Sequence, residues 1–382
     1  MNKSQIFFIN YLKVFSIILI CGYHFSYIND MYYSHNLTYL TIFNRFIFGF
    51  NSLAVPIFFM INGALLFNRE FELQKQLSRI KKNIIQFLIW TQLTYIIVGI
   101  SINKNFIINT LNSNNITFNK IFSTIYNSTV YVNHLWFIAV FIALQILFLL
   151  IYDSLNFSFD KNKLIILFYF ILFMWLFNFW INDFKTLAII FPVLKEIPIG
   201  KITAWNSTKL NPIENTYTGA MFTYFLLGGL IFKYKTYINK INTFLLIVCF
   251  IFGMILHEAR WYLFSANSNK NIENIFLGYF TTPVLLSTIV TFIFFFKFFN
   301  KPIKNKYLNY FFIIISQNTL AIYYIHWIIG SVFFKYLRNI LNILNIPSCL
   351  CIHFLISIFL ALISAIIGIF IKKIPFISYL LK

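Results

Sequence analysis

Charged residues are scarce in this sequence. Only 10% of its 382 residues are Asp, Glu, Lys or Arg, and 60% are hydrophobic, whereas a soluble domain carries about 25% charged residues. This scarcity excludes an ordinary soluble protein, and a mean hydropathy of +0.77 agrees. Among the charged residues the acidic ones are fewer, since the chain has 10 Asp and Glu and 30 Lys and Arg. The composition therefore indicates a polytopic membrane protein with basic segments between its spans.

Motifs of soluble enzymes are also missing. The sequence has no G-x-S-x-G, H-E-x-x-H, P-loop or dinucleotide-binding glycine pattern, so none of these can assign a reaction. Its four cysteines are Cys21, Cys249, Cys349 and Cys351. We interpret them as small buried hydrophobic residues, because Cys349-Leu-Cys351 lacks the further ligands of a zinc site. We expect neither a bound metal nor a permanently bound cofactor.

Mainly apolar windows of about 17 to 25 residues, the length that crosses a bilayer, recur along the chain. They fall near 13–30, 46–67, 84–102, 134–152, 164–181, 217–232, 241–257, 275–296, 310–333 and 349–371. We therefore predict an all-α fold, a transmembrane helix bundle of about ten spans in which the sixth is the shortest. No repeat or linker interrupts it, so residues 1–382 are expected to form one membrane-embedded domain. The first window has no small-residue cleavage site behind it, which favours a retained span.

Basic residues are distributed unevenly between the two sides of this predicted bundle. If the N-terminus is inside, the short inner segments hold 19 of the 30 lysines and arginines. That bias is the positive-inside pattern, so both termini are expected in the cytoplasm and segments 103–133 and 182–216 outside. The net charge of +20 then needs no nucleic-acid partner. We expect a multi-pass protein of a bacterial-type inner membrane.

His24 is the most informative single residue, because it lies inside the first apolar window. Ionisable groups within a membrane are costly and usually functional. Lys13 precedes it by eleven residues, so at about 1.5 Å per residue the two groups lie roughly 16 Å apart along one helix. The first span is therefore expected to carry a cation near its inner boundary and a base deep in the membrane.

Two more histidines are expected at a depth similar to that of His24. His134 opens the fourth window, followed by Trp136, which fits the aromatic belt at a membrane interface. His326 lies in the ninth window, which is unusually polar for a span. Ser316, Thr319, Tyr323 and His326 follow one another at spacings of three, four and three, which predicts a single helix face turned to the bundle interior. Three histidines from three spans at one depth are more suggestive than any one alone.

The second window contains Pro56 and the pair Asn62-Gly63 inside an otherwise apolar helix. Proline removes a backbone donor and is expected to kink the helix. Two interpretations of the pair remain open. Gly63 could serve close helix packing, or Asn62 could contact a substrate.

Basic residues follow immediately after the second window, in an amphipathic segment that includes Arg79 and Lys82. One interpretation is topological, since such charges hold a loop in the cytoplasm and touch anionic lipid. The other is that Arg79 and Lys82, one helical turn apart, bind the phosphates of a cytosolic donor. A further charged group, His257, Glu258 and Arg260, lies at the outer end of the seventh window, where we expect a solvated loop cluster.

In order along the chain, six short segments resemble those of the acyltransferase-3 family of integral membrane acyltransferases. They are Asn10-Tyr-Leu-Lys13 with His24, Val55-Pro-Ile-Phe-Phe-Met-Ile-Asn-Gly63, Arg79 to Lys82, His134-Leu-Trp-Phe137, Tyr224-Phe-Leu-Leu-Gly228, and Leu320-Ala-Ile-Tyr-Tyr-Ile-His326. The family has an arginine where this chain has Lys13, and commonly an aspartate where it has Asn10. Lysine keeps the charge but lacks the bidentate fork of arginine. The chain resembles the stand-alone form, without an SGNH-type hydrolase domain.

The resemblance implies transfer of an acyl group, most simply acetyl from cytosolic acetyl-CoA, to a hydroxyl of a surface polysaccharide, glycolipid or lipid-linked sugar. His24 would act as the general base, or would carry the acyl group itself. Asn62, Tyr323 or His326 would stabilise the oxyanion. The residues expected to bind donor or acceptor are Lys13, Arg79, Lys82, His134 and Trp136.

Two other functions remain open at this stage. A transporter or flippase of a lipid-linked or small polar substrate would also line a path with buried polar residues, although the paired broken helices common in transporters are not visible. The second is an inactive scaffold of a glycan-assembly complex. Apart from acyl-CoA, a glycan or glycolipid acceptor and the lipid bilayer, the sequence indicates no partner, and it leaves the oligomeric state undefined.

Overall fold

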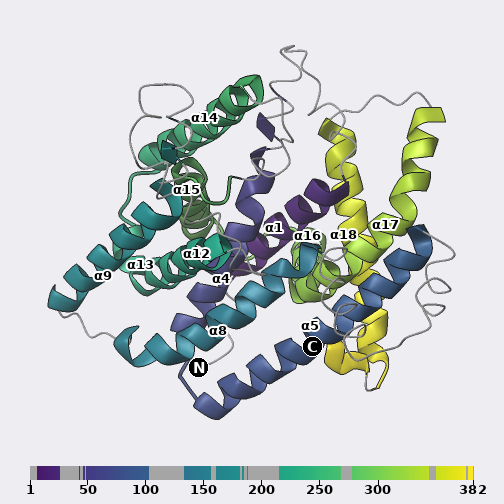
Figure 1. Cartoon of the computed structure of the whole chain (residues 1–382), viewed down its shortest axis with the longest axis horizontal. Coiled ribbons are helices and arrows are strands. Elements are labelled where there is room, and N and C mark those ends of the chain that lie inside the picture. The colour runs from purple at the N-terminus through teal and green to yellow at the C-terminus, as the bar shows by residue number, and fades with distance from the viewer. Residues whose placement is uncertain are drawn as a thin grey trace, which may run out of the picture. The chain divides into compact units, whose positions relative to one another are not determined.

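The computed structural model of the chain is helical in every regular element of the part that it describes (Figure 1). The described residues are 7–25, 49–102, 133–155, 161–180, 215–267, 278–343, 350–375 and 377–381, with single positions at 43, 46, 47, 183, 184 and 187. They form two compact units. Unit 1 comprises Met1–Ser16, Leu37–Glu70 and Leu147–Pro302, and unit 2 comprises Ile17–Asn36, Phe71–Ile146 and Ile303–Lys382.

Helices α1 (Phe7–Phe25) and α8 (Trp136–Leu155) contribute residues to both units. α1 begins six residues before Lys13, so Lys13 lies further inside the helix than the predicted window, which began at residue 13. His24 is the penultimate residue of the same helix. The prediction that one helix carries both groups is confirmed.

Unit 1 is built around two helix pairs. α4 (Asn51–Phe67) packs along α12 (Asn215–Lys233), and α14 (Thr243–Asn267) packs along α15 (Thr282–Phe298). α9 (Lys161–Trp175) and the short η2 (Leu176–Trp180) pack against α12. The short α13 (Lys235–Ile238) follows α12. The sixth predicted span, expected to be the shortest, is the 19-residue helix α12.

Glycines bring α4 and α12 into backbone contact. A Cβ added to Gly63 would clash with the backbone of Phe225, and one added to Gly228 would clash with the backbone of Met60. Glycine is needed here because only a residue without a side chain lets two helix backbones approach this closely. α4 continues as one helix through Pro56.

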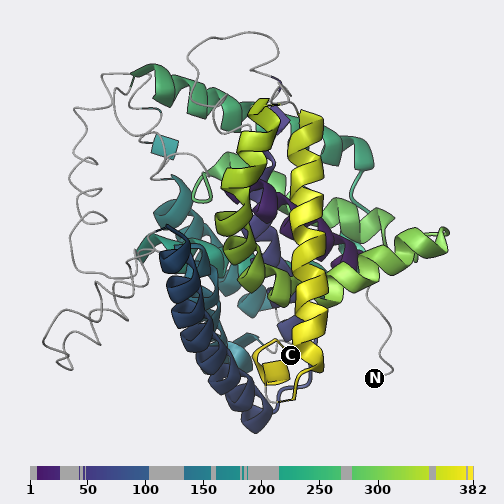
Figure 2. The same ribbon diagram turned by 90° about the vertical axis from the view of Figure 1, so that its right-hand side faces the viewer.

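Unit 2 is organised around α17 (Thr319–Ile343). It runs beside α18 (Leu350–Lys373), as Figure 2 shows, and also packs on α5 (Leu73–Ile102). The ring of Trp90 on α5 stacks on Tyr324, with centroids 5.1 Å apart. The Trp90 indole also donates a hydrogen bond of 3.0 Å to the carbonyl of Leu380 in η5 (Ile377–Leu380). α17 thus packs against both α18 and α5, and α5 is joined in turn to η5 by a hydrogen bond.

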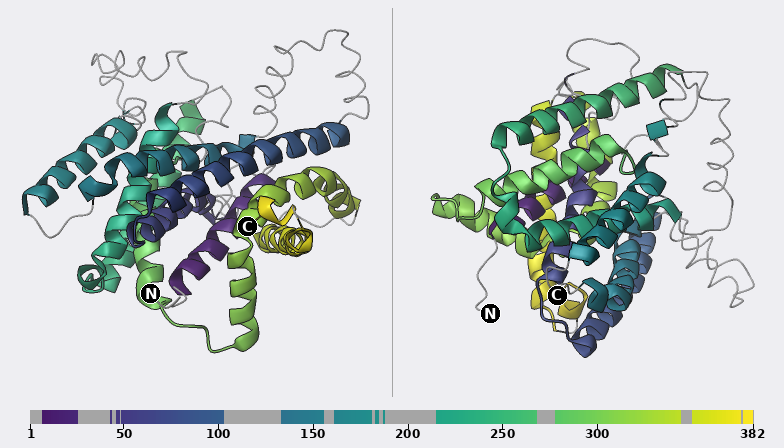
Figure 3. Two further views of the ribbon diagram at one scale, coloured as in Figure 1. Left: turned by 90° about the horizontal axis from the view of Figure 1, so that it is seen from below. Right: turned by 90° about the vertical axis from the view of Figure 1, so that its left-hand side faces the viewer.

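The ninth predicted span is broken. α16 (Lys306–Gln317) and α17 meet at Asn318 with a bend of 78° (Figure 3). The ammonium of Lys372 stabilises the bend, because it donates to the side chain of Asn318 at 2.7 Å and to the carbonyl of Gln317 at 3.2 Å. The prediction that Ser316 shares one helix face with Tyr323 and His326 was therefore wrong, since Ser316 belongs to α16.

Every predicted window overlaps a helix, but not every helix meets the length of a span. Among the described residues, three helices are long and apolar enough to cross a membrane, Phe7–Phe25, Thr243–Arg260 and Phe354–Lys373. The bent pair α16 and α17 would make a fourth. Several apolar helices are shorter, Asn51–Phe67 and Thr282–Phe298 among them. The total of about ten spans and their orientation stay predictions.

Some predictions fall outside the described residues. They concern the terminal residues 1–6 and 382, and most of the segments 103–133 and 182–216. By contrast, His257 lies in the described part of the chain, and the prediction that it belongs to a solvated loop cluster was wrong. His257 is in the middle of helix α14 and is 2% exposed.

Candidate active site

Three histidine rings from three elements meet within unit 2. His24 ends α1, His134 lies in the short η1 (Asn133–Leu135) that precedes α8, and His326 is on α17. The ring centroid of His24 is 5.5 Å from that of His326 and 6.4 Å from that of His134, and the other two are 5.6 Å apart. Residues that are roughly 100 or more positions apart in sequence therefore form one imidazole cluster.

The three rings differ in their access to solvent. His134 is 2% exposed and His326 is 0% exposed, whereas His24 is half-buried. A general base must touch the proton that it removes. Within this cluster, His24 is the least enclosed of the three histidines.

The tautomer of His326 is fixed by its own helix. Its Nδ1 lies 3.0 Å from the carbonyl oxygen of Ile322, and because a carbonyl oxygen only accepts hydrogen bonds, Nδ1 carries the hydrogen. In the neutral ring Nε2 then holds a lone pair. That Nε2 is buried and has no hydrogen-bond partner. His326 thus offers an unused acceptor inside the cluster.

Tyr323 links α17 to the element that holds His134. Its hydroxyl donates a hydrogen bond to the main-chain carbonyl of His134, and its ring packs near the rings of His134 and His326. A phenol has one hydrogen to donate. In this arrangement that hydrogen is used to position His134.

Trp327 completes the cluster and was given no role in the sequence analysis. Its indole lies parallel to the His134 ring, with centroids 4.8 Å apart and planes inclined by 11°, and it meets the His24 ring edge to face at 4.9 Å. Its position next to His326 was the available signal. Only the three-dimensional structure shows that it packs against two of the rings.

Glycine lets the end of α1 approach α17. A Cβ added to Gly330 would clash with the ring of Phe25, the neighbour of His24. The Phe25 ring in turn packs against Trp327, with centroids 5.4 Å apart. The position of His24 therefore depends on a close contact between the two helices.

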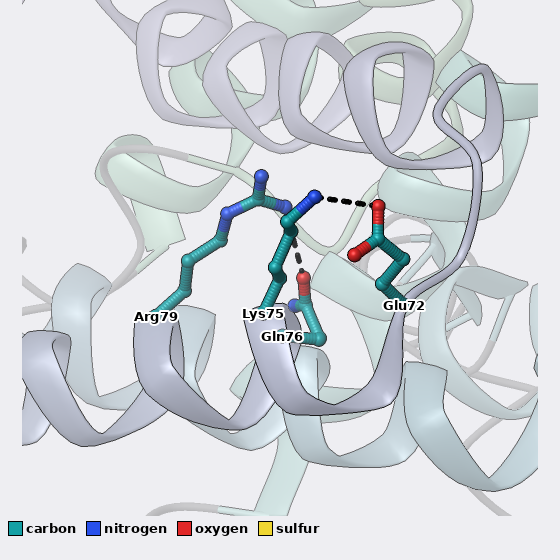
Figure 4. Close-up of polar contacts among 4 residues, drawn as sticks. All are labelled: Glu72, Lys75, Gln76 and Arg79. Atoms are coloured by element: carbon teal, nitrogen blue, oxygen red, sulfur yellow. Dashed lines mark hydrogen bonds and ion pairs between the residues drawn. The ribbon is translucent and has the colours of Figure 1, made fainter.

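The predicted donor-binding cations of unit 2 lie on α5. Figure 4 shows the side chains of Arg79 and Lys75 rising from the same side of the helix, where Arg79 donates to Gln76 at 3.3 Å and Lys75 pairs with Glu72 at 2.6 Å. Both basic residues are exposed.

Lys82 is the more enclosed of the two predicted donor-binding cations on α5. It is half-buried, and its ammonium lies over the ring of Tyr379, 5.7 Å from the centroid. Burial lowers the pKa of this ammonium. A charge held over an aromatic ring in this way is partly ordered before any ligand binds.

The remaining predicted site residues are placed as follows. Lys13 and Asn62 belong to unit 1, where the charge of Lys13 is close enough to that of Arg69 for the two to repel. The amide of Asn62 donates to the carbonyl of Phe58 on its own helix, at 2.9 Å. Trp136 is half-buried at the start of α8, two residues after His134. The structure thus brings together His24, His134, His326 and Tyr323 within unit 2.

The comparisons with known proteins identify the family. The model of the acyltransferase-3 family, described as an acyltransferase domain, matches residues 6–372, nearly the whole of this sequence. The chain belongs to that family. No curated protein and no solved structure matches it.

Proposed function

We propose that this acyltransferase-3 protein is a membrane O-acyltransferase, which moves an acyl group from cytosolic acyl-CoA to a hydroxyl of a surface polysaccharide, glycolipid or lipid-linked sugar. Acetyl is the simplest group, with acetyl-CoA as co-substrate. Membership of the family supports an acyltransferase activity. The apolar helices of the chain support its assignment as an integral membrane protein. The single observation that carries the proposal is the cluster of three imidazoles in which His24 is the least enclosed of the three histidines.

In the proposed reaction His24 is the general base. An alcohol is a poor nucleophile at neutral pH, so the imidazole lone pair takes the hydroxyl proton while the oxygen attacks the thioester carbonyl. The tetrahedral intermediate collapses, the carbon–sulfur bond breaks and the thiolate of CoA leaves. The imidazolium then returns the proton to that sulfur, so the products are an ester and free CoA.

His326 is proposed to support this base. Its bare Nε2 can accept a hydrogen bond from one nitrogen of His24, which leaves the other nitrogen of His24 as the lone pair that faces the acceptor. The two rings are not hydrogen-bonded here, but catalytic contacts commonly tighten only when substrate binds. Oxyanion stabilisation needs a hydrogen-bond donor, and here the hydrogens of His326 Nδ1 and of the Tyr323 hydroxyl are held by the carbonyls of Ile322 and His134. Either residue would stabilise the oxyanion only after it releases that hydrogen bond.

A covalent route uses the same residues. His24 could attack the thioester itself, carry the acyl group as an acyl-imidazole and pass it to the acceptor, with release of CoA in the first half. An acyl-enzyme would then form from acyl-CoA without acceptor. Rapid mixing with labelled acetyl-CoA and acid quenching, followed by mass measurement of the intact chain, distinguishes the two routes.

Donor binding is proposed to use the basic residues Arg79 and Lys82 on α5, both in unit 2. Neighbouring cations suit the phosphate oxygens of CoA. Arg79 is exposed, so a donor in solution can reach its side chain. Lys82 is held over an aromatic ring, so its side chain is partly ordered before the donor binds. In the predicted topology these positions face the cytoplasm of a bacterial-type inner membrane, where acyl-CoA is made.

The experiment that tests the function is labelling with radioactive acetyl-CoA. Purified chain in lipid vesicles is incubated with labelled donor and with glycolipid extracted from an envelope, beside a His24→Ala control. Transfer to the glycolipid by the wild type alone supports the proposal. A transporter or flippase would move glycolipid across the vesicle without label, and a scaffold would do neither, so either result overturns the acyltransferase function.

A further inference from the structure

A second group of buried polar side chains lies in unit 1, away from any role in the proposed reaction. Asp183 accepts a hydrogen bond of 3.0 Å from the backbone N–H of Thr282, at the start of α15. The hydroxyl of Thr282 accepts one of 2.9 Å from the indole of Trp175 on α9. Asp183 and Trp175 are both half-buried. Two segments distant in sequence from α15 thus converge on its first residue.

Helix α14 adds three charged or titratable side chains within one turn. His257 is 2% exposed, and its Nδ1 has no hydrogen-bond partner. It packs under Gly278, where a Cβ would come within 2.8 Å of its ring, and Gly278 has a φ of 56° that favours glycine. Arg260 is half-buried and close enough to Asp183 for their charges to attract. Burial raises the pKa of Asp183, and the hydrogen bonds from Thr282 and the charge of Arg260 oppose this.

Polar side chains of α14 and α4 also lie near the start of α4. Glu258, half-buried on α14, approaches so close to Gly49 that a Cβ there would clash with its carboxylate. Two residues beyond Gly49, Asn51 is 2% exposed, and neither the oxygen nor the nitrogen of its amide has a hydrogen-bond partner. An unpaired buried amide or imidazole costs about 1 to 3 kcal/mol. Groups of this kind indicate a ligand that satisfies them.

We propose that Asp183, His257, Glu258 and Arg260, the α14 cluster, form a binding site for the hydroxyl groups of a sugar. Two carboxylates disfavour a simple anion as the ligand, and the arginine disfavours a simple cation. The mixture supplies both donors and acceptors at once, which is what a neutral polyol needs because each hydroxyl both donates and accepts. Three half-buried charged side chains and one buried imidazole supply the few polar groups that such a site requires.

The identification of this sugar as the acyl acceptor rests on the proposed function, whereas the binding itself does not. In the predicted topology, the end of α14 and the segment that contains Asp183 both face outward, where a surface glycan is found. Binding can be measured without turnover. The sugar-binding site and the acyltransferase function can therefore be rejected independently of each other.

The test is a titration of the full-length chain in detergent with methyl glycosides of the common hexoses and N-acetylhexosamines, to concentrations well above the millimolar range. Tryptophan fluorescence is the readout because Trp175 contacts Thr282, and Trp175→Phe identifies its signal. Asp183→Asn and Arg260→Gln are the test variants. The amide oxygen of Asn can still accept from Thr282, so the first should fold. Glu70→Gln, an exposed carboxylate changed to an amide, is the matched control.

At least one glycoside is expected to bind, with affinity reduced about tenfold or more in Asp183→Asn and Arg260→Gln. The control and His24→Ala should bind as the wild type does. The site is overturned if no glycoside binds the wild type, or if the two variants bind unchanged. If Asp183→Asn does not fold, Arg260→Gln alone decides. Sugar binding by a chain that transfers no acyl group would keep the site and reject the acyltransferase function.

Discussion

The indole of Trp327 stacks on the imidazole of His134, with ring centroids 4.8 Å apart and planes inclined by only 11°. Both ring nitrogens of His134 are buried without a hydrogen-bond partner. The ring is therefore held by aromatic packing on one side and, through its backbone, by the Tyr323 hydroxyl on the other. In hydrolase triads a carboxylate orients the imidazole. Here packing orients the His134 ring, so the shapes of neighbouring side chains should affect turnover strongly.

Gly330→Ala tests that dependence. The added methyl group would clash with the ring of Phe25 and displace the end of α1, including His24. Because small displacements of a catalytic group can reduce a rate about a hundredfold, we expect turnover to fall much more than folded yield. Turnover and thermal stability of the purified variant are the measurements. Leu230→Ala, a truncation at a half-buried position in unit 1, is the control, and equal losses in the two variants would contradict the prediction.

The helices and the histidine cluster could be anticipated from sequence for a simple reason. Apolar runs and the depth of polar residues along a helix are local properties, so every window overlaps a helix and the three histidines expected at one depth do meet. The break at Asn318 is different, because it depends on Lys372, a residue that lies 54 positions later and donates to its side chain. No local pattern reveals such a partner.

Burial of His257 was missed for a related reason. A titratable residue at the end of an apolar run favours a solvated position, but the turn at Gly278, with its positive φ, covers the ring. The orienting role of Trp327 was missed because stacking depends on the angle between rings. Sequence spacing places residues on helix faces but does not define how faces of different helices meet.

Tyr323→Phe distinguishes positioning from oxyanion stabilisation. The hydroxyl of Tyr323 donates its one hydrogen to the carbonyl of His134, so we expect a loss of about 0.6 kcal/mol in stability, as for an average membrane hydrogen bond. Turnover should stay within about tenfold of the wild type. Removal of an oxyanion donor would instead cost about 10² to 10³ in kcat. Steady-state kinetics of a well-folded variant with such a loss would reassign Tyr323 to the oxyanion site.

Arg79→Ala and Lys82→Ala test donor binding. Phosphate contacts lie far from the reacting carbonyl and act as binding energy, so we expect the KM for acyl-CoA to rise while kcat changes little. The matched control is Lys75→Ala, since Lys75 lies on the same side of α5 as Arg79 but pairs with Glu72. Initial rates at varied acyl-CoA give both constants. A collapse of kcat at constant KM would show that these cations do not bind the donor in the proposed way.

Reporter fusions at Asn115 and Lys382 test the predicted topology. The excess of lysine and arginine in short inner segments predicts that both termini are cytoplasmic and that the segment around Asn115 is outside. A reporter active only in the cytoplasm should therefore function at Lys382, and one active only outside should function at Asn115. Function of the same reporter at both positions would contradict the arrangement of spans between them.

His24→Ala is expected to abolish transfer without unfolding the protein. His24 is half-buried, whereas His134 and His326 are almost completely enclosed, so His24 is the histidine of the cluster that we expect to meet an acceptor hydroxyl. If its role were structural, loss of its contacts would reduce stability modestly and leave turnover measurable. Loss of the base should lower turnover by about 10² or more. Folded yield and turnover of His24→Ala, measured beside His134→Ala and His326→Ala, decide between these roles. Near-normal turnover in well-folded His24→Ala would move the reaction to His326, whose unpaired Nε2 is the next available base.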